Sequence, residues 1–500
     1  MHDLLKDAFD AEKFRQQGHQ LIDMLADHLN AVQHGNARHG NARHGNAQHT
    51  NSPNGKTQQP VISWHKPEDE LAFWEQDLAK GQGDALDLFR TVISRSIHLH
   101  HNKYMGHQVV PPAPLGALAS LLSSFLNNGS AVYEMGAVSN ALERVVTQQL
   151  CQQIGWQEES GGILTSGGTL ANLTALLTAR RVKAQANVWG EGMGQKLALM
   201  VSAEAHYCVD RAARIMGWGS EGIIKIPVND KFQMRTELLE EHLAKAKADG
   251  LEVIAVVGSA CTTSTGAYDN LVEISDFCTK NDLWFHVDGA HGGAVIFSDK
   301  YRHLAKGINL ADSVVIDMHK MLLAPALTTA LLYRKEVDSY RTFAQQAQYL
   351  WSSQEDQEWY NMGKRTMECT KLMMSVKVYA LIKTYGTSLF DKYVSRQYDL
   401  GKSFAELIKK RALFELGIEP STNIVCFRYK AADVGEDKVD ELNSYIRQAL
   451  VEQGEFYIVQ TRLNNKVYLR TTLMNSNTTE KELNELLNRI EELAQHAYGD

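Results

Sequence analysis

The 500-residue sequence has few of the residues that define several large classes of protein. Its six cysteines include no Cys-x-x-Cys pair, which argues against a disulfide framework or a zinc site and favours free thiols in a reducing compartment. No apolar run approaches the ~20 residues that cross a bilayer, so we expect no transmembrane helix. Residues 1–7 carry acids where a secretory signal would carry basic residues, and we expect a cytoplasmic protein.

An excess of basic charge is also absent. The chain has 51 Lys and Arg against 59 Asp and Glu, which gives a net charge of −8 and a pI of about 6.2. Composition therefore provides no electrostatic reason to expect binding to nucleic acid or to a membrane. Hydrophobic residues make up 44% of the chain, enough for a large core and more than one domain.

The N-terminal part contains two contrasting patterns. Apolar residues at helical spacing predict an amphipathic helix between Phe14 and Leu29. From His34 the pentad His-Gly-Asn-Ala-Arg repeats with almost no apolar residue, so we interpret 33–60 as a flexible insert. Its histidines, spaced five apart, could bind a metal, but a linker produced by repeat expansion is the better interpretation and no metal site is predicted.

Residues 160–335 alternate apolar, strand-like runs with helical patterns, as at 236–248 and 271–279. This alternation predicts an α/β fold, a mostly parallel sheet wrapped by helices, with ligands bound at the carboxyl ends of the strands. The expected strands are 197–202, 223–228, 253–259, 283–287, 313–316 and 329–333.

Three motifs follow such apolar runs. Ser166-Gly167-Gly168-Thr169 opens a helical pattern, and the N–H groups of a glycine-rich turn at a helix N-terminus suit a phosphate. Asp288 ends an apolar run and is followed by small residues, which leave room for a flat group. Lys320 follows the run 314–316, where burial without a partner would lower the pKa of its amine and make it a nucleophile. Each residue alone is compatible with ordinary packing, but the ordered set fits pyridoxal 5'-phosphate.

With these motifs the chain resembles the group II pyridoxal-phosphate-dependent amino-acid decarboxylases, the family of aromatic-amino-acid, glutamate and diaminobutyrate decarboxylases. The resemblance rests on His286-Val287-Asp288-Gly289-Ala290 and on Asp317 with His319-Lys320, and it extends from about Phe14 to the C-terminus. It implies the aspartate-aminotransferase-like fold, fold type I of the pyridoxal-phosphate enzymes. It also implies a homodimer with the active site at the subunit interface.

The domain division that we expect has three parts. Residues 1–100 form an N-terminal helical dimerisation segment, 101–385 a large cofactor-binding domain, and 386–500 a small C-terminal α+β domain. In the last part we expect helices at 372–385 and 388–413, and strands at 423–429 and 466–472. A final helix should begin at the capping-box pattern Thr479-x-x-Glu482.

The resemblance also implies a role for each site residue. Lys320 would join the cofactor aldehyde as a Schiff base, and Asp288 would keep the pyridine nitrogen protonated. The reaction would then run through an external aldimine and a quinonoid intermediate to an amine and CO2. The other residues expected at the cofactor are Ala290 under the ring, His206 stacked over it, Gly167, Gly168 and Thr169 at the phosphate, and Thr262 and His319 beside it.

Substrate residues are less well defined by the pattern. A mobile loop within 349–365 would carry a catalytic tyrosine, for which Tyr349 and Tyr360 compete. Tyr104 and His107 are the candidate substrate contacts. The basic residues Lys103, Lys364 and Arg365 would favour an acidic substrate such as glutamate or aspartate, which we prefer, whereas Glu134 and Glu368 would favour a diaminobutyrate-like one. An aromatic substrate also stays open.

Two other interpretations are a different reaction with the same cofactor and a protein without catalytic activity. The same cofactor also serves aldehyde synthases, aldolases and transaminases, which differ from decarboxylases by small changes in loops. A non-catalytic scaffold is disfavoured, because the lysine, the aspartate, the stacking histidine and the glycine turn are all present. The small-molecule partner expected is therefore an amino acid.

Overall fold

The computed structural model describes residues 2–34, 50–51, 57–192, 194–343, 358–430 and 435–498. Contacts divide the chain into two compact units, one from residues 1–107, 403–417 and 426–500 and the other from 108–402 and 418–425. The N-terminal and C-terminal segments thus share a unit, a grouping that the sequence pattern does not reveal. Whether the three predicted parts are independently folding domains stays a prediction. The repeats predicted to be a flexible insert, from residue 35 to 49, and Tyr349 lie outside the described residues.

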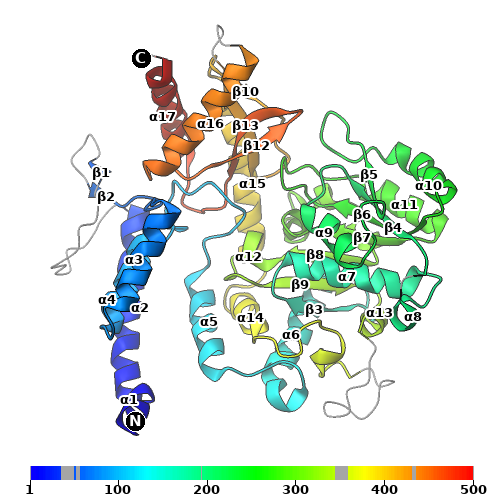
Figure 1. Cartoon of the computed structure of the whole chain (residues 1–500), viewed down its shortest axis with the longest axis horizontal. Coiled ribbons are helices and arrows are strands. Elements are labelled where there is room, and N and C mark those ends of the chain that lie inside the picture. Colours follow the sequence, from blue (N-terminus) through cyan, green and yellow to red (C-terminus); the bar gives the residue numbers. More distant parts are fainter. Residues whose placement is uncertain are drawn as a thin grey trace. The chain divides into compact units, whose positions relative to one another are not determined.

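The larger unit is built on a seven-stranded sheet (Figure 1). The strands lie in the order β3-β9-β8-β7-β6-β4-β5. Strands β8, β7, β6, β4 and β5 run parallel to one another, and β9 is antiparallel to both of its neighbours, β3 and β8. The mostly parallel sheet of fold type I is thereby confirmed, as are the six predicted strands. The strands are β3 (Gly161–Thr165), β4 (Leu197–Ser202), β5 (Ile223–Ile226), β6 (Glu252–Ser259), β7 (Trp284–Asp288), β8 (Ser313–Asp317) and β9 (Thr329–Tyr333).

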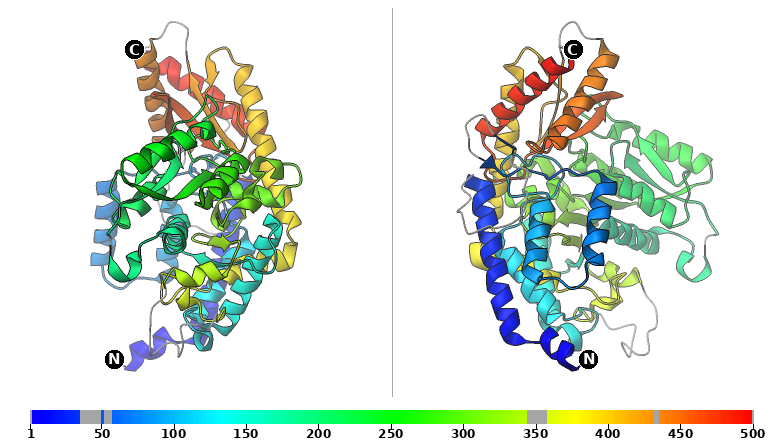
Figure 2. Two further views of the ribbon diagram at one scale, coloured as in Figure 1. Left: turned by 90° about the vertical axis from the view of Figure 1, so that its right-hand side faces the viewer. Right: turned by 60° about the vertical axis from the view of Figure 1, so that its left-hand side comes forward.

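Helices cover this sheet, as the two further views show (Figure 2). Helix α7 (Gly168–Lys183) contacts β3 and β6 to β9. Its residues 171–179 are all buried, and several are alanine or threonine, so the helix can lie close to the strands. The other helices of this part of the chain are α5 (Pro114–Leu126), α6 (Tyr133–Ile154), α8 (Val188–Glu191), α9 (Tyr207–Ile215), α10 (Leu239–Ala248), α11 (Leu271–Asn281), α12 (Met318–Met321), α13 (Val337–Arg341), α14 (Met374–Tyr385) and α15 (Ser388–Lys409).

The outer edge of β3 is closed by charged side chains in place of another strand. The backbone N–H of Leu164 donates to Glu143 Oε1 (2.9 Å), and the carbonyl of Leu164 accepts from Lys371 Nζ (2.8 Å). Two residues earlier, the carbonyl of Gly162 accepts from Arg365 Nη2 (3.1 Å). Glu143 and Arg365 are completely buried, so these backbone groups are satisfied away from water.

The smaller unit combines N-terminal helices with a C-terminal sheet and its helices. The sheet has the order β10-β11-β13-β12, and α16 packs on β13 and on α17. Its last helix begins as predicted: Thr479 N–H donates to Glu482 Oε2 (2.9 Å), and Lys481 N–H donates to Thr479 Oγ1 (3.3 Å). The elements are α1 (His2–Ala8), α2 (Ala11–His34), β1 (Thr50–Asn51), β2 (Thr57–Gln58), α3 (Pro67–Ala79), α4 (Ala85–Arg95), β10 (Phe414–Leu416), β11 (Ile424–Tyr429), α16 (Glu436–Glu452), β12 (Val459–Leu463), β13 (Lys466–Thr472) and α17 (Glu480–Tyr498).

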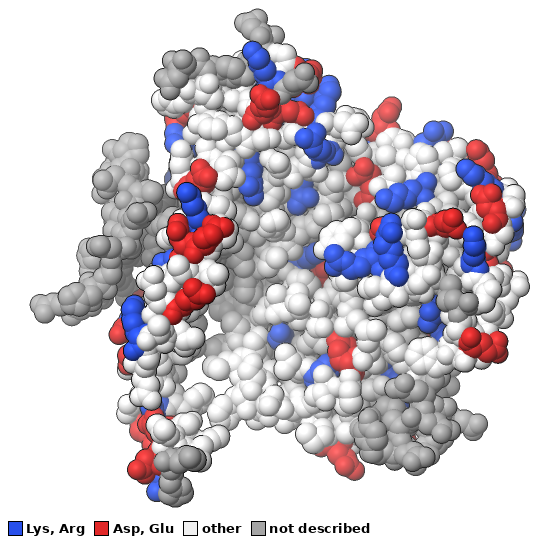
Figure 3. Space-filling view, viewed as in Figure 1, with Lys and Arg blue, Asp and Glu red and all other residues white. Residues whose placement is uncertain are grey.

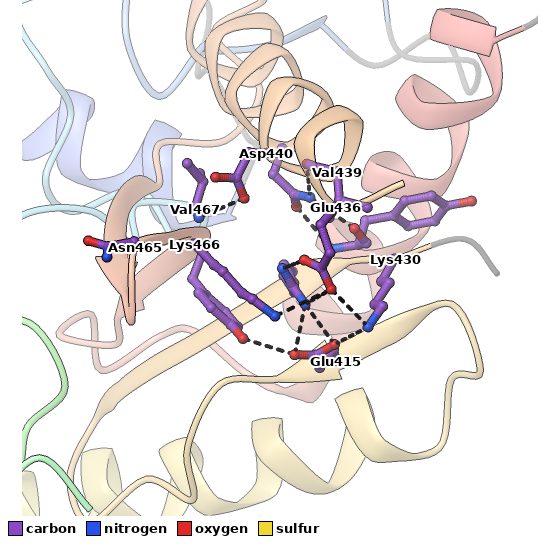
Figure 4. A network of polar contacts seen from close by, with 12 residues as sticks. Glu415, Lys430, Glu436, Val439, Asp440, Asn465, Lys466 and Val467 are labelled. Atoms are coloured by element: carbon purple, nitrogen blue, oxygen red, sulfur yellow. Dashed lines mark hydrogen bonds and ion pairs between the residues drawn. The ribbon is translucent and has the colours of Figure 1, made fainter. Parts of the chain in front are cut away.

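A charged network joins these C-terminal elements (Figure 4). The buried Arg428 guanidinium donates to Glu436 Oε2 (2.8 Å) and to Glu415 Oε2 (3.0 Å), and Lys430 also contacts both carboxylates. The hydrogen bond from Arg428 lowers the pKa of Glu436 to about 2. Burial alone would raise the pKa of Glu415, but its hydrogen bonds from Arg428, Tyr468 and Lys430 outweigh burial and lower it.

This network should make stability sensitive to acid. Both folded-state pKa values are lowered, so the stabilisation is present above the ordinary glutamate pKa of 4.5 and is lost as pH falls towards about 2. In Arg428→Met we expect a smaller loss of unfolding free energy between about pH 6 and about pH 3 than in the parent chain, measured by urea denaturation. An unchanged loss would contradict the assignment of acid sensitivity to this network.

Surface charge is mixed. On the face drawn in Figure 3, the Lys and Arg side chains are interspersed with Asp and Glu, and no broad area carries a single sign. Among the described helices, none is long and apolar enough to span a membrane.

Candidate active site

A cavity of about 290 Å³ lies in the larger unit at the carboxyl ends of the strands. Segments that follow β3, β4, β6, β7 and β8 all contribute to its wall. Of the nine residues predicted to bind the cofactor, all except Thr262 line it. The lining residues are Ser166, Gly167, Gly168, Thr169, Asn172, His206, Cys208, Cys261, Thr263, Asp288, Ala290, His291, Asp317, His319, Lys320 and Leu327.

One wall of the cavity is the N-terminus of α7. Gly167 has φ +118°, a conformation that favours glycine, and among the described residues no side chain caps this helix end. An ideal Cβ built on Gly168 would lie 3.1 Å from the carboxylate of Asp317, so a larger residue would crowd the wall. A glycine turn with an uncapped helix N-terminus fits the phosphate of the cofactor.

Lys320 projects into the same cavity from α12. Its Nζ lies 3.2 Å from Asp317 Oδ2, and Asp317 Oδ1 accepts a hydrogen bond from Thr329 Oγ1 (2.5 Å). Burial alone would lower the pKa of the lysine, but the carboxylates of Asp317 and Asp288 outweigh burial and raise it. The expectation of a lysine with a lowered pKa is therefore wrong, because it assumed burial without a partner.

The predicted ring-binding residues lie at or just after the carboxyl ends of strands β4, β7 and β8. Asp288 is the last residue of β7, and its Oδ1 accepts from the N–H of Ala290 (3.2 Å). His206 precedes α9, and its Nδ1 accepts from the N–H of Cys208 (3.3 Å). Burial lowers the pKa of His206, and the nearby Asp288 carboxylate opposes this shift. His319 Nδ1 lies 3.0 Å from the carbonyl oxygen of Thr328, which holds the ring against the cavity wall.

The loop after β6 differs from the expectation. Thr262 Oγ1 lies 2.9 Å from Thr265 Oγ1 and accepts from the N–H of Ala267 (3.1 Å), so this side chain is used inside its own loop. Its neighbours Cys261 and Thr263 line the cavity instead. Thr263, and not Thr262, is therefore the threonine of this loop that lies at the cavity.

The candidate substrate residues are not among those that line the cavity. Tyr104 and His107 belong to the smaller unit, where Tyr104 stacks on Tyr457 with ring centroids 5.5 Å apart. Tyr360 contacts the ring of Tyr133, and its carbonyl accepts from Asn140 Nδ2 (2.6 Å). Their roles in catalysis stay predictions.

The charged residues considered for substrate selection have partners of their own. Lys364 pairs with Glu358 (2.8 Å), Arg365 pairs with Glu336, and Lys103 of the smaller unit pairs with Glu485 (3.2 Å). Glu134 is exposed on α6. Glu368 accepts from the hydroxyl of Ser166 (3.0 Å), so it contacts a residue of the cavity wall.

Sequence reasoning did not select several lining residues, among them Asn172, Cys208 and His291. Asn172 follows Gly168 by one helical turn and is a polar residue in a buried stretch of α7. A polar residue in an otherwise apolar run can be recognised in the sequence. Cys208 and His291 carry no such signal, because small or polar residues near a strand end are common.

The parallel sheet, the glycine turn, the aspartate and the lysine define a fold type I pyridoxal-phosphate enzyme. Residues 75–430 match the pyridoxal-dependent decarboxylase conserved domain, and the chain belongs to this family. The chain is thus a pyridoxal-phosphate-dependent amino-acid decarboxylase, a carboxy-lyase, as the resemblance implied.

Individual relatives support the same family. An aromatic-L-amino-acid decarboxylase of Bacillus atrophaeus is 26% identical over 487 residues, which cover 97% of this chain and 96% of that protein. An L-aspartate decarboxylase of Metarhizium robertsii is 30% identical over 352 residues, 70% of each chain. The crystal structure of mouse CSAD has a TM-score of 0.82 at 27% identity and covers 87% of this chain and 93% of that one.

Proposed function

We propose that the lining residues hold pyridoxal phosphate and act on an L-amino acid in this cavity. When bound, the cofactor supplies the electron sink for the charge that remains after CO2 leaves. Lys320 would hold the cofactor covalently, and Asp288 would keep a proton on the pyridine nitrogen. The other proposed contacts are Gly167, Gly168 and Thr169 at the phosphate, Ala290 and His206 on the two ring faces, and Thr263 and His319 beside the ring.

Asp317 positions the Lys320 amine in this proposal. The carboxylate lies 3.2 Å from Lys320 Nζ, and its charge contributes to the raised pKa of the lysine. The hydrogen bond from Thr329 keeps the carboxylate in place.

We propose a small acidic substrate, glutamate or aspartate, with diaminobutyrate or an aromatic amino acid as the alternative. The 30% identical relative is named for L-aspartate, which supports the acidic class. The test is CO2 release by the purified holoenzyme from aspartate, glutamate, diaminobutyrate, tyrosine and DOPA, with the products identified. Preference for aspartate or glutamate with amine as product supports the proposal. Preference for another substrate, or aldehyde as product, contradicts it.

We also propose that the enzyme is a homodimer with its active site at the subunit interface. Leu118, Leu121, Leu122, Phe125 and Leu126 recur on one face of α5, and each is about half exposed or more. Such a continuous apolar stripe is unusual on a surface that stays in water, and a second copy of the chain would cover it.

The dimer proposal predicts a change of assembly. Leu122→Glu should shift the protein towards monomer in light scattering after size exclusion, because a charge would be buried in the interface. Ile215→Glu is the matched control, since Ile215 is also exposed, at 61% against 51% for Leu122, but lies on α9. A monomeric parent chain, or the same shift in both variants, would contradict the proposal.

We place the protein in the cytoplasm. None of the six cysteines, all of them in the described part of the chain, forms a disulfide, and five of them are buried, which is the state that a reducing compartment maintains. Cell fractionation tests this assignment.

A further inference from the structure

We propose that His286 is a positioning residue for the phosphate end of the cofactor site. It acts through a chain of hydrogen bonds that runs from β7 and β8 into the first turn of α7. The inference rests on the proposed function, since it assumes that the glycine turn at Gly167 and Gly168 holds the phosphate.

Four contacts make up the chain, and every side chain in it is buried. Trp284 Nε1 donates to Ser313 Oγ (2.9 Å), which lies 2.8 Å from His286 Nδ1. His286 Nε2 lies 2.8 Å from Asn172 Oδ1, and Asn172 Nδ2 donates to the carbonyl of Gly168 (3.0 Å). The four side chains are at most 2% exposed, so water does not compete with these bonds.

Each donor in the chain can be assigned. The Asn172 amide nitrogen faces a carbonyl, so its oxygen faces the histidine and His286 Nε2 must carry a hydrogen. Burial lowers the pKa of His286 to about 4, although the Asp288 carboxylate opposes this shift, so the ring is neutral near pH 7. Nδ1 therefore accepts from the Ser313 hydroxyl, which in turn accepts from the indole of Trp284. All the bonds point one way, towards Gly168.

The chain links the two ends of the proposed cofactor site. His286 and Asp288 lie on the same strand, two residues apart, with Asp288 proposed at the pyridine nitrogen. The hydrogen bonds from His286 hold Asn172, and Asn172 holds the carbonyl of the first residue of α7. Strand β7 thus sets the separation between the ring subsite and the phosphate cradle, which are contributed by segments more than 100 residues apart.

The test compares two ligands that differ only in the phosphate. Dissociation constants of the apo-protein for pyridoxal 5'-phosphate and for pyridoxal are measured by spectroscopic titration. In His286→Leu we expect the affinity for the phosphorylated ligand to fall by about 10-fold, with the affinity for pyridoxal nearly unchanged. His286→Gln keeps a donor that can reach Asn172, so its affinity for pyridoxal 5'-phosphate should lie between those of the parent and of His286→Leu. Asn172→Asp replaces the donor that faces the Gly168 carbonyl with an acceptor, so its affinity for pyridoxal 5'-phosphate should be as low as in His286→Leu.

Thr178→Val is the matched control. Thr178 lies on the same helix, is fully buried and also makes hydrogen bonds, to Tyr333 (2.9 Å) and Thr342 (2.6 Å), but it is not in the chain. Its affinities for both ligands should stay close to those of the parent. Equal weakening of both ligands in His286→Leu, no weakening of either, or the same ligand selectivity in Thr178→Val would overturn the inference.

The parent chain separates this inference from the proposed function. If the parent protein binds neither ligand, the proposed function itself fails. If the parent binds both and prefers the phosphorylated one, while the preference survives in the His286 and Asn172 variants, only the positioning role fails.

Discussion

Lys320→Ala is expected to reduce CO2 release by about 10³-fold or more, as is usual when a group that forms the covalent link is removed. Among the described residues that line the cavity, Lys320 is the only lysine, and its amine is partnered by Asp317. The variant should also lose the visible absorbance of the covalently bound cofactor. Both properties are measured on the purified protein, by trapping released CO2 and by an absorption spectrum with added pyridoxal phosphate.

Two variants distinguish the loss of the covalent link to the cofactor from the loss of a positive charge. Lys320→Arg keeps a positive charge beside Asp317 but cannot supply the amine nitrogen, so it should be as inactive as the alanine variant. Lys225→Ala removes an exposed lysine of β5 and should keep the full activity. Retention of activity and of the spectrum in Lys320→Ala would show that the cofactor lysine lies elsewhere.

Lys371→Met is expected to lower the free energy of unfolding by about 3–5 kcal/mol. Lys371 Nζ lies 2.5 Å from Glu143 Oε1, and both side chains are buried. The substitution leaves the Glu143 carboxylate without its counter-ion and also removes the hydrogen bond to the carbonyl of Leu164. Urea denaturation followed by circular dichroism measures the change.

A double variant and a control variant test whether the loss of stability comes from the broken ion pair. The double variant Lys371→Met with Glu143→Gln removes the uncompensated charge and should recover part of the loss. Lys377→Met is the matched control: Lys377 is also buried, burial lowers its pKa, and no ion pair with it is found among the described residues. That variant should be at least as stable as the parent. A loss of similar size in both lysine variants would contradict the argument from the buried pair.

Strand positions could be predicted from the sequence because local chemistry decides them. Six strands of the larger sheet are short apolar runs, and the sequence pattern alone locates them. The exception is β3, whose first two residues are Gly161 and Gly162. Glycine weakens the strand pattern, and the strand is held between β9 and charged side chains from distant segments. Contacts of that kind have no local signature.

The site shows the same division between local and long-range information. The turn before α7, Asp288 and Lys320 could be predicted to line one cavity, because each follows or ends an apolar run and has a residue type that is unusual there. Thr262 does not line the cavity, whereas its neighbour Thr263 does, since neighbouring side chains in a loop can point in opposite directions. The raised pKa of Lys320 could not be predicted either, because it depends on the distances to Asp317 and Asp288 in the folded chain.

The most direct test of the account is to locate the covalently bound cofactor. Borohydride reduction of the holoenzyme fixes pyridoxal phosphate to the amine that holds it, and peptide mapping by mass spectrometry then identifies the labelled lysine. We expect one label, on the peptide that contains Lys320. A label on another lysine, or no label on a protein loaded with the cofactor, would contradict the central claim that Lys320 holds the cofactor in this cavity.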